Sequence, residues 1–208
     1  MVKKVISSVF IIMLILSLAV MGNGVKAYSN SDFSIDVPSD YKSSGKNVWA
    51  KSNGDNFNIQ IDEYDEKITV SLEDAYKQVM DEATKDSLYA DVETKEVINI
   101  SKNDYKCAHL KAKAVYSGVS FYVDQYMVIS DNKIYVLTFS SADKSYFSSS
   151  EVEDVKESFT IENYKEPQVV KNRVEKVANN IAKRVLIGVA VGAVVGAISG
   201  VAYKIKRK

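Results

Sequence analysis

Hydrophobic and polar residues alternate with a period of two along most of the middle of the chain, which predicts β-strands. The predicted strands cover residues 33–37, 47–50, 57–61, 93–101, 105–116, 119–130 and 133–141. Turn sequences separate neighbouring strands: an Asn-Gly pair within 52–55, Ser-Gly at 117–118 and Asp-Asn at 131–132. The last four strands are therefore expected to pair as an antiparallel sheet.

In two segments the apolar residues recur at the spacing of a helix instead of alternating. Ser71 carries an acid three residues further on, and apolar residues then recur at helical spacing, which predicts an amphipathic helix over 72–86. The same capping spacing between Ser148 and Glu151 predicts a shorter helix that runs to Phe159. The order strands, helix, strands, helix predicts an α+β fold, with helices packed on an antiparallel sheet.

The N-terminus has the pattern of an export signal. Two lysines precede an apolar run of 16 residues that starts at Val5, and small residues follow as far as Ala27. This order predicts a secretory signal peptide over 1–27, cleaved before Tyr28. The alternative is an uncleaved anchor, because 16 residues are only a little fewer than the ~20 that span a membrane. Either reading places the acidic body, residues 28–164, outside the cytoplasm.

A second apolar run, residues 185–203, precedes the basic tail 204–208. In a helix this run nearly spans a hydrocarbon core of ~30 Å, which predicts a transmembrane helix with its tail in the cytoplasm. Between the body and this helix lies the basic segment 165–184, which carries an apolar stripe at helical spacing. It is expected to lie on anionic headgroups or to extend the transmembrane helix, and a solvated linker helix is the alternative.

Glycine recurs at every fourth position of the predicted transmembrane helix. The four residues are Gly188, Gly192, Gly196 and Gly200. Residues four apart share a helix face, so a second helix could approach closely along this groove. The repeat resembles the glycine-zipper segments of several bacterial envelope proteins, which implies self-association. The alternative is that glycine is simply common in membrane helices.

Charge and composition narrow the possible functions. Lys and Arg number 27, as do Asp and Glu, but residues 28–164 hold 14 bases against 25 acids, while 165–208 hold 10 bases against two acids. Such an acidic body repels phosphate backbones, which argues against nucleic-acid binding. The single cysteine, Cys107, excludes an intrachain disulfide, and the single histidine, His109, argues against a multi-histidine metal centre.

Cys107 and His109 are two residues apart in a predicted strand and so project to the same face. Such a pair could activate a nucleophile or supply half of a metal site. One residue of each type cannot complete a zinc tetrahedron without carboxylates, and the opposite face, with Leu110 among alanines, is the better core face. We therefore expect a surface or half-buried structural pair, and no catalytic residue, metal ligand or cofactor.

Four acids crowd the end of a predicted strand: Asp62, Glu63, Asp65 and Glu66. Carboxylate oxygens at this density could hold calcium. The spacing lacks the glycine and the final glutamate of an EF-hand loop, so a solvated acidic loop is expected.

Tyrosine is abundant in the body, with 12 of the chain's 13 tyrosines in residues 28–164. Tyr116, Tyr122, Tyr126 and Tyr135 lie on adjoining predicted strands. Tyrosine supplies rigid amphipathic surface, so these residues are a possible binding face for a peptide or a glycan. An ordinary half-buried sheet is the alternative.

Several short motifs of the body resemble one known family. They are Phe33 to Pro38, Trp49 in the next strand, Ser71 to Asp74 at a helix start, Tyr135 to Ser140 in the last strand, and Ser158-Phe159. Over residues 33–161 these motifs resemble the PsbP-like superfamily. The resemblance implies an α-β-α sandwich around a central antiparallel sheet, usually without an active site. The metal ligands of the plant branch have no match here.

These patterns together predict a non-catalytic binding or accessory module, held outside a bacterial cell membrane by a single C-terminal span. Its expected partners are membrane lipid, a second copy through the transmembrane helix, and an envelope protein or a glycan. The alternative is a structural membrane oligomer assembled through the glycine repeat. An enzyme that uses Cys107 and His109 is a third hypothesis.

Overall fold

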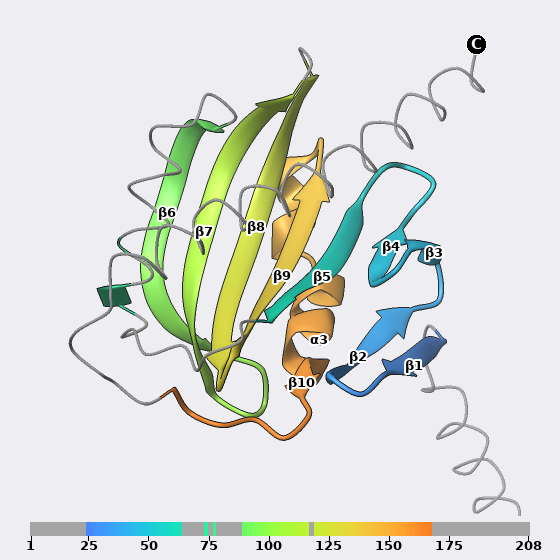
Figure 1. Ribbon diagram of the computed structural model, residues 1–208. Helices are drawn as coiled ribbons and strands as arrows, with labels where there is room; N and C mark the ends of the chain where they lie inside the picture. Colours follow the sequence, from blue (N-terminus) through green and yellow to red (C-terminus); the bar gives the residue numbers. More distant parts are fainter. Residues whose placement is uncertain (1–23, 64–72, 75–76, 78–88, 117–118, 168–208) are drawn as a thin grey trace, which may run out of the picture.

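A seven-stranded antiparallel sheet, the central sheet, forms the middle of the computed structural model, which describes residues 24–63, 73–74, 77, 89–116 and 119–167 (Figure 1). In spatial order its strands are β3 (Lys42–Gly45), β4 (Val48–Ala50), β5 (Asn56–Glu63), β9 (Lys133–Ser141), β8 (Val119–Ser130), β7 (Tyr105–Tyr116) and β6 (Tyr89–Ile100). The antiparallel run β6 to β9 confirms the pairing that the alternation predicts.

The turns of the central sheet have the chemistry that their sequences predict. Between β4 and β5, the Lys51 N–H donates to the Asp55 carbonyl over 2.8 Å, and Gly54 has φ 101°, in the left-handed region that favours glycine. Between β8 and β9, Ser130 is opposite Lys133, and Asp131 has φ 51°. Asn and Asp tolerate this backbone conformation better than other side chains, so both hairpins close without a longer loop.

A second layer, the small sheet, joins the two ends of the described chain. It consists of β1 (Val25–Ser29), β2 (Phe33–Pro38) and β10 (Thr160–Ile161), with β2 in the middle. The 3₁₀ helix η1 (Lys144–Ser148) and the helix α3 (Ser150–Ser158) follow β9. The small sheet and α3 lie on one side of the central sheet (Figure 1).

Helix α3 begins one residue later than its sequence pattern predicts. Ser149, not Ser148, is the N-cap, and its side chain accepts a hydrogen bond from the Val152 N–H over 3.3 Å. Ser148 instead ends η1, so the preceding turn takes up the first serine. Val152 and Val155, on the inner face of α3, are each 1% exposed and fix the helix against the central sheet.

The hydrophobic core lies between the central sheet and the layer of α3 and β2. Four phenylalanines from these elements are completely buried: Phe33, Phe57, Phe139 and Phe159. Their rings contact one another and Trp49, with centroids 4.9–6.3 Å apart. Burying each such side chain contributes about 1.5–3 kcal/mol, so this cluster accounts for much of the packing energy between the layers.

Both faces of β7 are buried, which corrects the expectation for Cys107 and His109. Leu110 is 4% exposed, as the predicted core face requires, but Cys107 and His109 are only 0% and 5% exposed. The small sheet and α3 cover the face of Cys107, and that cover comes from segments far away in the sequence. The pair is therefore buried instead of lying at the surface or half-buried.

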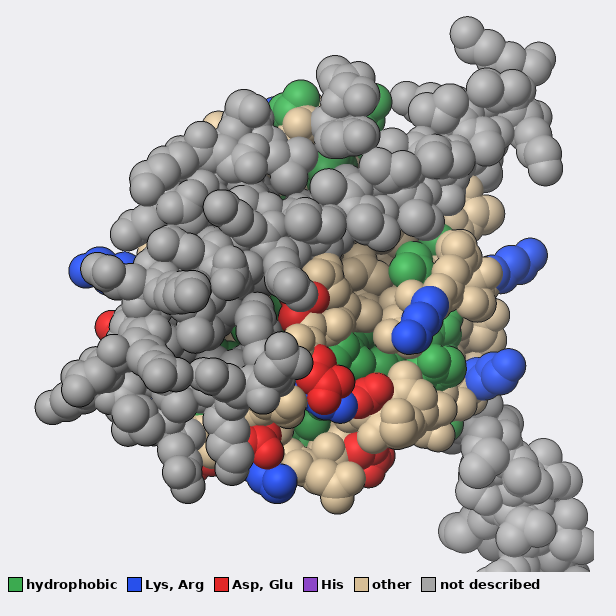
Figure 2. All heavy atoms as spheres, in the orientation of Figure 1, with side chains coloured by type: hydrophobic (Ala, Val, Ile, Leu, Met, Phe, Trp, Pro, Cys, Tyr) green, Lys and Arg blue, Asp and Glu red, His purple; other side chains and the backbone are tan. Residues whose placement is uncertain are grey.

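The acidic charge of the body is partly balanced at its surface. Figure 2 shows acidic side chains gathered in the lower middle of one face, with lysines beside them. Lys133 donates to Asp32 over 2.6 Å, and this hydrogen bond raises the pKa of Lys133; Lys144 contacts Glu93 over 2.7 Å. Ion pairs near the surface are screened by solvent, so these pairs weaken the acidic field more than they stabilise the fold.

Several predicted segments lie wholly or largely outside the described residues. They are the signal peptide up to residue 23, most of the helix 72–86, and residues 168–208 with the transmembrane helix and the glycine repeat. Glu73, Asp74 and Lys77 are described, and they are helical and exposed, in agreement with the predicted helix. Within the described ranges, no helix combines the length and the apolar content needed to cross a membrane. The described parts show the antiparallel sheet and one covering helix of the predicted α-β-α sandwich.

Candidate functional site

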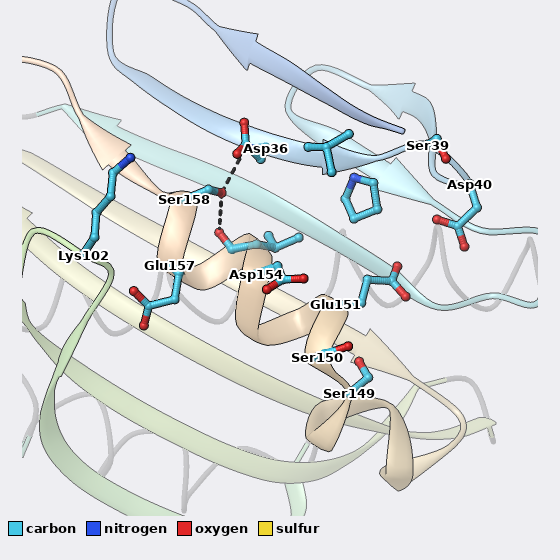
Figure 3. Close-up of a pocket in the computed structure, with 13 residues that line it drawn as sticks. Asp36, Ser39, Asp40, Lys102, Ser149, Ser150, Glu151, Asp154, Glu157 and Ser158 are labelled. Atoms are coloured by element: carbon cyan, nitrogen blue, oxygen red, sulfur yellow. Dashed lines mark hydrogen bonds between the residues drawn. The ribbon is translucent and has the colours of Figure 1, made fainter. Parts of the chain in front are cut away.

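The strongest candidate site is a groove between the small sheet and α3, with a volume of about 870 Å³ (Figure 3). Asp36 and Pro38 of β2 and the turn residues Ser39 and Asp40 form one wall. Helix α3 forms the other wall, and Lys102 closes one end. Ser158 ties the two walls together, because its Oγ accepts the Asp36 N–H over 2.9 Å and donates to the Val155 carbonyl over 2.9 Å.

Carboxylates dominate the groove. Asp154 and Glu157 lie along the exposed side of α3, and Asp36 lies on β2 (Figure 3). Among the described contacts, none of these three acids has an ion-pair partner. One lysine, Lys102, lines the groove against them. The groove therefore presents unneutralised negative charge to any molecule that enters it.

Lys51 pairs with the two other acids of the groove and offsets one of their two charges. Its Nζ lies 3.0 Å from Asp40 and also donates to Glu151, and it lies 4.8 Å from the centroid of the Tyr41 ring. Burial alone lowers the pKa of Lys51, but the hydrogen bonds that it donates to Glu151 and Asp40 outweigh this effect, so the pKa is raised. This end of the groove thus contains an internal salt bridge. The carboxylates that face solvent without a described lysine partner lie toward Asp154 and Glu157.

Two of the four serines that line the groove are occupied by structural hydrogen bonds. Ser149 caps α3, and Ser158 both donates to and accepts from the backbone. Acyl transfer by a serine needs a base within hydrogen-bond distance of the hydroxyl, and neither hydroxyl has such a neighbour among the described contacts. The arrangement suits binding better than nucleophilic chemistry.

A second polar cluster, the His109 network, is buried between the central sheet and α3. The two ring nitrogens of His109 both face carboxylates, Nε2 at 2.7 Å from Asp124 and Nδ1 at 2.9 Å from Glu96. The Tyr126 hydroxyl donates to Asp124 over 3.1 Å, and the His109 and Tyr126 rings stack with centroids 4.6 Å apart. Lys111 Nζ lies 3.5 Å from the same carboxylate.

The partners of His109 within the described residues suit a structural role. Each ring nitrogen has a carboxylate oxygen within hydrogen-bond distance. That arrangement leaves no ring nitrogen free to take a proton from a nucleophile. Burial raises the pKa of the Cys107 thiol to about 12, so this neighbour is not a thiolate at neutral pH. These observations weigh against the third hypothesis, an enzyme based on Cys107 and His109.

The tyrosines do not form one exposed face. Tyr126 and Tyr135 are each 2% exposed and belong to the hydrophobic core, which corrects their assignment to a binding face. Burial raises the pKa of both hydroxyls. Tyr122 is half-buried, and Tyr116 ends β7 opposite Val119. The face turned toward α3 is a packing surface, so tyrosine content alone did not identify a ligand site.

The acidic strand end is described only in part. Asp62 and Glu63 end β5, while residues 65 and 66 lie outside the described residues. Asp62 accepts a hydrogen bond from Gln60 over 3.2 Å, and Glu63 lies 3.9 Å from Lys133. Within the described residues, no group of three or more His, Cys, Asp or Glu side chains is arranged to hold a metal ion.

Sequence reasoning missed both Asp124 and the groove. The position of Asp124 could have been predicted from the sequence. The turn at 117–118 places His109 opposite Tyr126, and Asp124 is two residues from Tyr126 on the same face. The groove had no comparable signal. Asp36 and Ser158 are 122 residues apart, and no local pattern brings them together.

No protein-family model and no curated protein matches this sequence. Several solved structures are similar to part of it, among them the following three. A protein from Bacteroides thetaiotaomicron shares 17% identity with a TM-score of 0.46 over 63% of this chain, which spans 45% of that protein's length. The cyanobacterial PsbP of Synechocystis shares 15% identity, with a TM-score of 0.42, over 67% of this chain and 94% of its own.

The third is LpqN, which is involved in cell envelope biogenesis of Mycobacterium tuberculosis. It shares 9% identity with a TM-score of 0.38 over 67% of this chain and 85% of its own. Similarity at these levels does not show a function. The function proposed below therefore rests on the side chains of this chain.

Proposed function

We propose that this chain is a non-catalytic binding module, held outside the cytoplasm by residues 185–203, whose groove takes an extended basic segment of another envelope protein. The observation that carries the proposal is the groove of about 870 Å³ with three carboxylates, Asp36, Asp154 and Glu157, that have no ion-pair partner among the described residues. The export signal and the C-terminal apolar run of the sequence support the location.

The charge and shape of the groove favour a cationic, elongated ligand. The three carboxylates come from both walls of the groove, so an extended ligand with several Lys or Arg side chains can meet more than one acid. Lys51 provides an internal example at one end, where one ammonium group bridges Asp40 and Glu151. A neutral glycan could use the serines, but two of them, Ser149 and Ser158, are already hydrogen-bonded to the backbone.

A charge-matched pair of variants tests the groove. The full chain in detergent is titrated with fluorescent decalysine, first as wild type and then as the triple variant Asp36→Asn, Asp154→Asn, Glu157→Gln. We expect the triple variant to bind at least fivefold more weakly, because each amide removes a charge from the groove while keeping its shape.

The control variant removes the same charge elsewhere on the body, at Asp104, Glu162 and Glu166, each of which is exposed. It should bind decalysine almost as well as the wild type. Equal weakening in the two triple variants would show that decalysine follows only the net charge of the body, and the groove would lose its role. Binding of a chitin or peptidoglycan oligosaccharide with no response to decalysine would favour a glycan ligand instead.

The glycine repeat supports a second function, a structural membrane oligomer. Four glycines on one face of a predicted transmembrane helix let helices pack closely, and the outer domain then spaces or shields them. The two functions differ in what they require, because an oligomer depends on residues 188–200 and a binding module depends on its groove.

A further inference from the structure

The first three residues of β1 pair with β2 but contribute little packing. Val25, Lys26 and Ala27 are opposite Pro38, Val37 and Asp36, and the side chains of all three are exposed. Tyr28, in contrast, packs on Trp49 with ring centroids 5.0 Å apart, and its hydroxyl donates to Asn47 over 3.1 Å. The anchored part of β1 therefore begins at Tyr28, the residue that follows the predicted cleavage site.

The directions of the N–H and C=O groups of β2 show which of them form hydrogen bonds with β1. The Asp36 N–H donates to Ser158 on the opposite side of β2 from β1. Since consecutive strand residues direct their N–H and C=O groups to opposite sides, the groups of Val37 point toward β1. Lys26 and Val37 thus form a pair that exchanges two backbone hydrogen bonds, and loss of Lys26 leaves both groups of Val37 without a strand partner.

This edge borders the groove. Val25 lines the groove together with Asp36 and Pro38, so the residues before the cleavage site fill part of its rim. A chain that begins at Tyr28 lacks that rim and has a wider groove, with the backbone of Val37 at its margin.

We propose that the edge of β2 at Val37 accepts an extended segment of the partner protein, antiparallel to β2, and that removal of residues 1–27 opens this edge. In the structure, Val25 to Ala27 already lie on the edge in the way the partner would. The partner residue in the place of Val25 faces the groove acids, so a basic residue is favoured there. The inference rests on the proposed basic-segment function and adds the strand pairing and its control by processing.

The test compares two forms of the full chain in detergent, one that begins at Tyr28 and one that begins at Gly24. The probe is a capped, fluorescent peptide with the sequence of residues 22–27 and Lys in place of Val25. Binding should be at least tenfold tighter to the Tyr28 form, because the Gly24 form covers the edge with its own strand.

N-methylation of the peptide separates backbone pairing from charge. A methyl group on the amide of the residue at position 26 removes the donor to Val37 and should weaken binding at least tenfold. The same methyl group at position 27, whose N–H points away from β2, should change binding less than twofold. Equal binding to the two chain forms, equal effects of the two methyl groups, or no binding to either form would overturn the inference.

Decalysine binding, measured on the same two chain forms, separates this inference from the groove itself. If the peptide does not bind but decalysine still binds in a groove-dependent way, only the proposed strand pairing at β2 is rejected. If neither the peptide nor decalysine binds, the proposed function is rejected as well.

Discussion

Cys107 and His109 are neighbours on one face of β7, yet burial acts on them in different ways. The thiol has no charged group in hydrogen-bond contact among its described neighbours, so desolvation raises its pKa to about 12. His109 has carboxylates from β6 and β8 as neighbours, and these satisfy both nitrogens of the buried ring. One face of a strand thus holds a desolvated thiol and a histidine whose two ring nitrogens are hydrogen-bonded.

The thiol gives a direct prediction at the residue scale. At pH 8 a thiol with a pKa of about 12 is ionised in only about one molecule in ten thousand, and Cys107 is also completely buried. Ellman's reagent should therefore leave the folded chain unmodified over an hour and react with one thiol per chain in guanidinium chloride. Rapid reaction of the folded chain would show that the face of Cys107 opens to solvent.

Asp124 should be the residue on which the His109 network depends. Asp124→Ala leaves the His109 ring and the Tyr126 hydroxyl buried without their shared acceptor, so we expect the free energy of unfolding to fall by about 3 kcal/mol. The comparison is Glu96→Ala, which removes a half-exposed partner and should cost less than about 1 kcal/mol. Urea unfolding followed by Trp49 fluorescence measures both, and similar losses would contradict the assigned role of Asp124.

At the scale of elements, the sequence was informative where one pattern extends over many residues. Strands β5 to β9 alternate long enough to be predicted with bounds close to those observed, apart from the start of β6. Strand β3 has four exposed residues, Lys-Ser-Ser-Gly, and β10 has only two residues, so neither has a pattern to detect. These short strands form because a neighbouring strand supplies their hydrogen-bond partners. The groove between β2 and α3 also depends on contacts between distant segments, so no local pattern predicts it.

The cap of α3 gives a prediction for this element. Ser149→Ala removes the acceptor for the Val152 N–H and should lower the free energy of unfolding by about 1 kcal/mol. Ser150→Ala, one residue further on and exposed, should have almost no effect. If the two variants were reversed in urea unfolding, the cap would be Ser150, and α3 would begin one residue later than described.

At the scale of the whole molecule, the predicted cleavage site lies inside β1. Cleavage before Tyr28 keeps the residue that packs on Trp49 and removes the three exposed residues in front of it. We expect the protein extracted from membranes to begin at Tyr28, which intact-mass analysis will measure directly. A mass that includes Met1 would indicate an uncleaved anchor and two membrane passages.

The glycine repeat makes a prediction for the assembled molecule. Replacing Gly192 and Gly196 by Leu inserts branched side chains into the proposed helix contact, whereas the same change at Val191 and Val195 should face lipid. We expect the Gly192/Gly196 variant to form less crosslinked dimer than the wild type, and the Val191/Val195 variant to form as much as the wild type. The loss should be partial, because each contact contributes only about 1 kcal/mol. Equal dimer yields would leave the four glycines without a role in association and favour the binding module.

The position of β10 determines when the body can finish folding. Strand β2 is made early in the chain, but its partner β10 and the buried Phe159 come more than 120 residues later. Contacts between such distant residues form slowly, and a chain exported from its N-terminus releases them last. Until Ile161 has emerged, β2 has only one neighbour and the core lacks its closing aromatic ring. The completion of folding and the arrival of the segment next to the proposed anchor are therefore a single event.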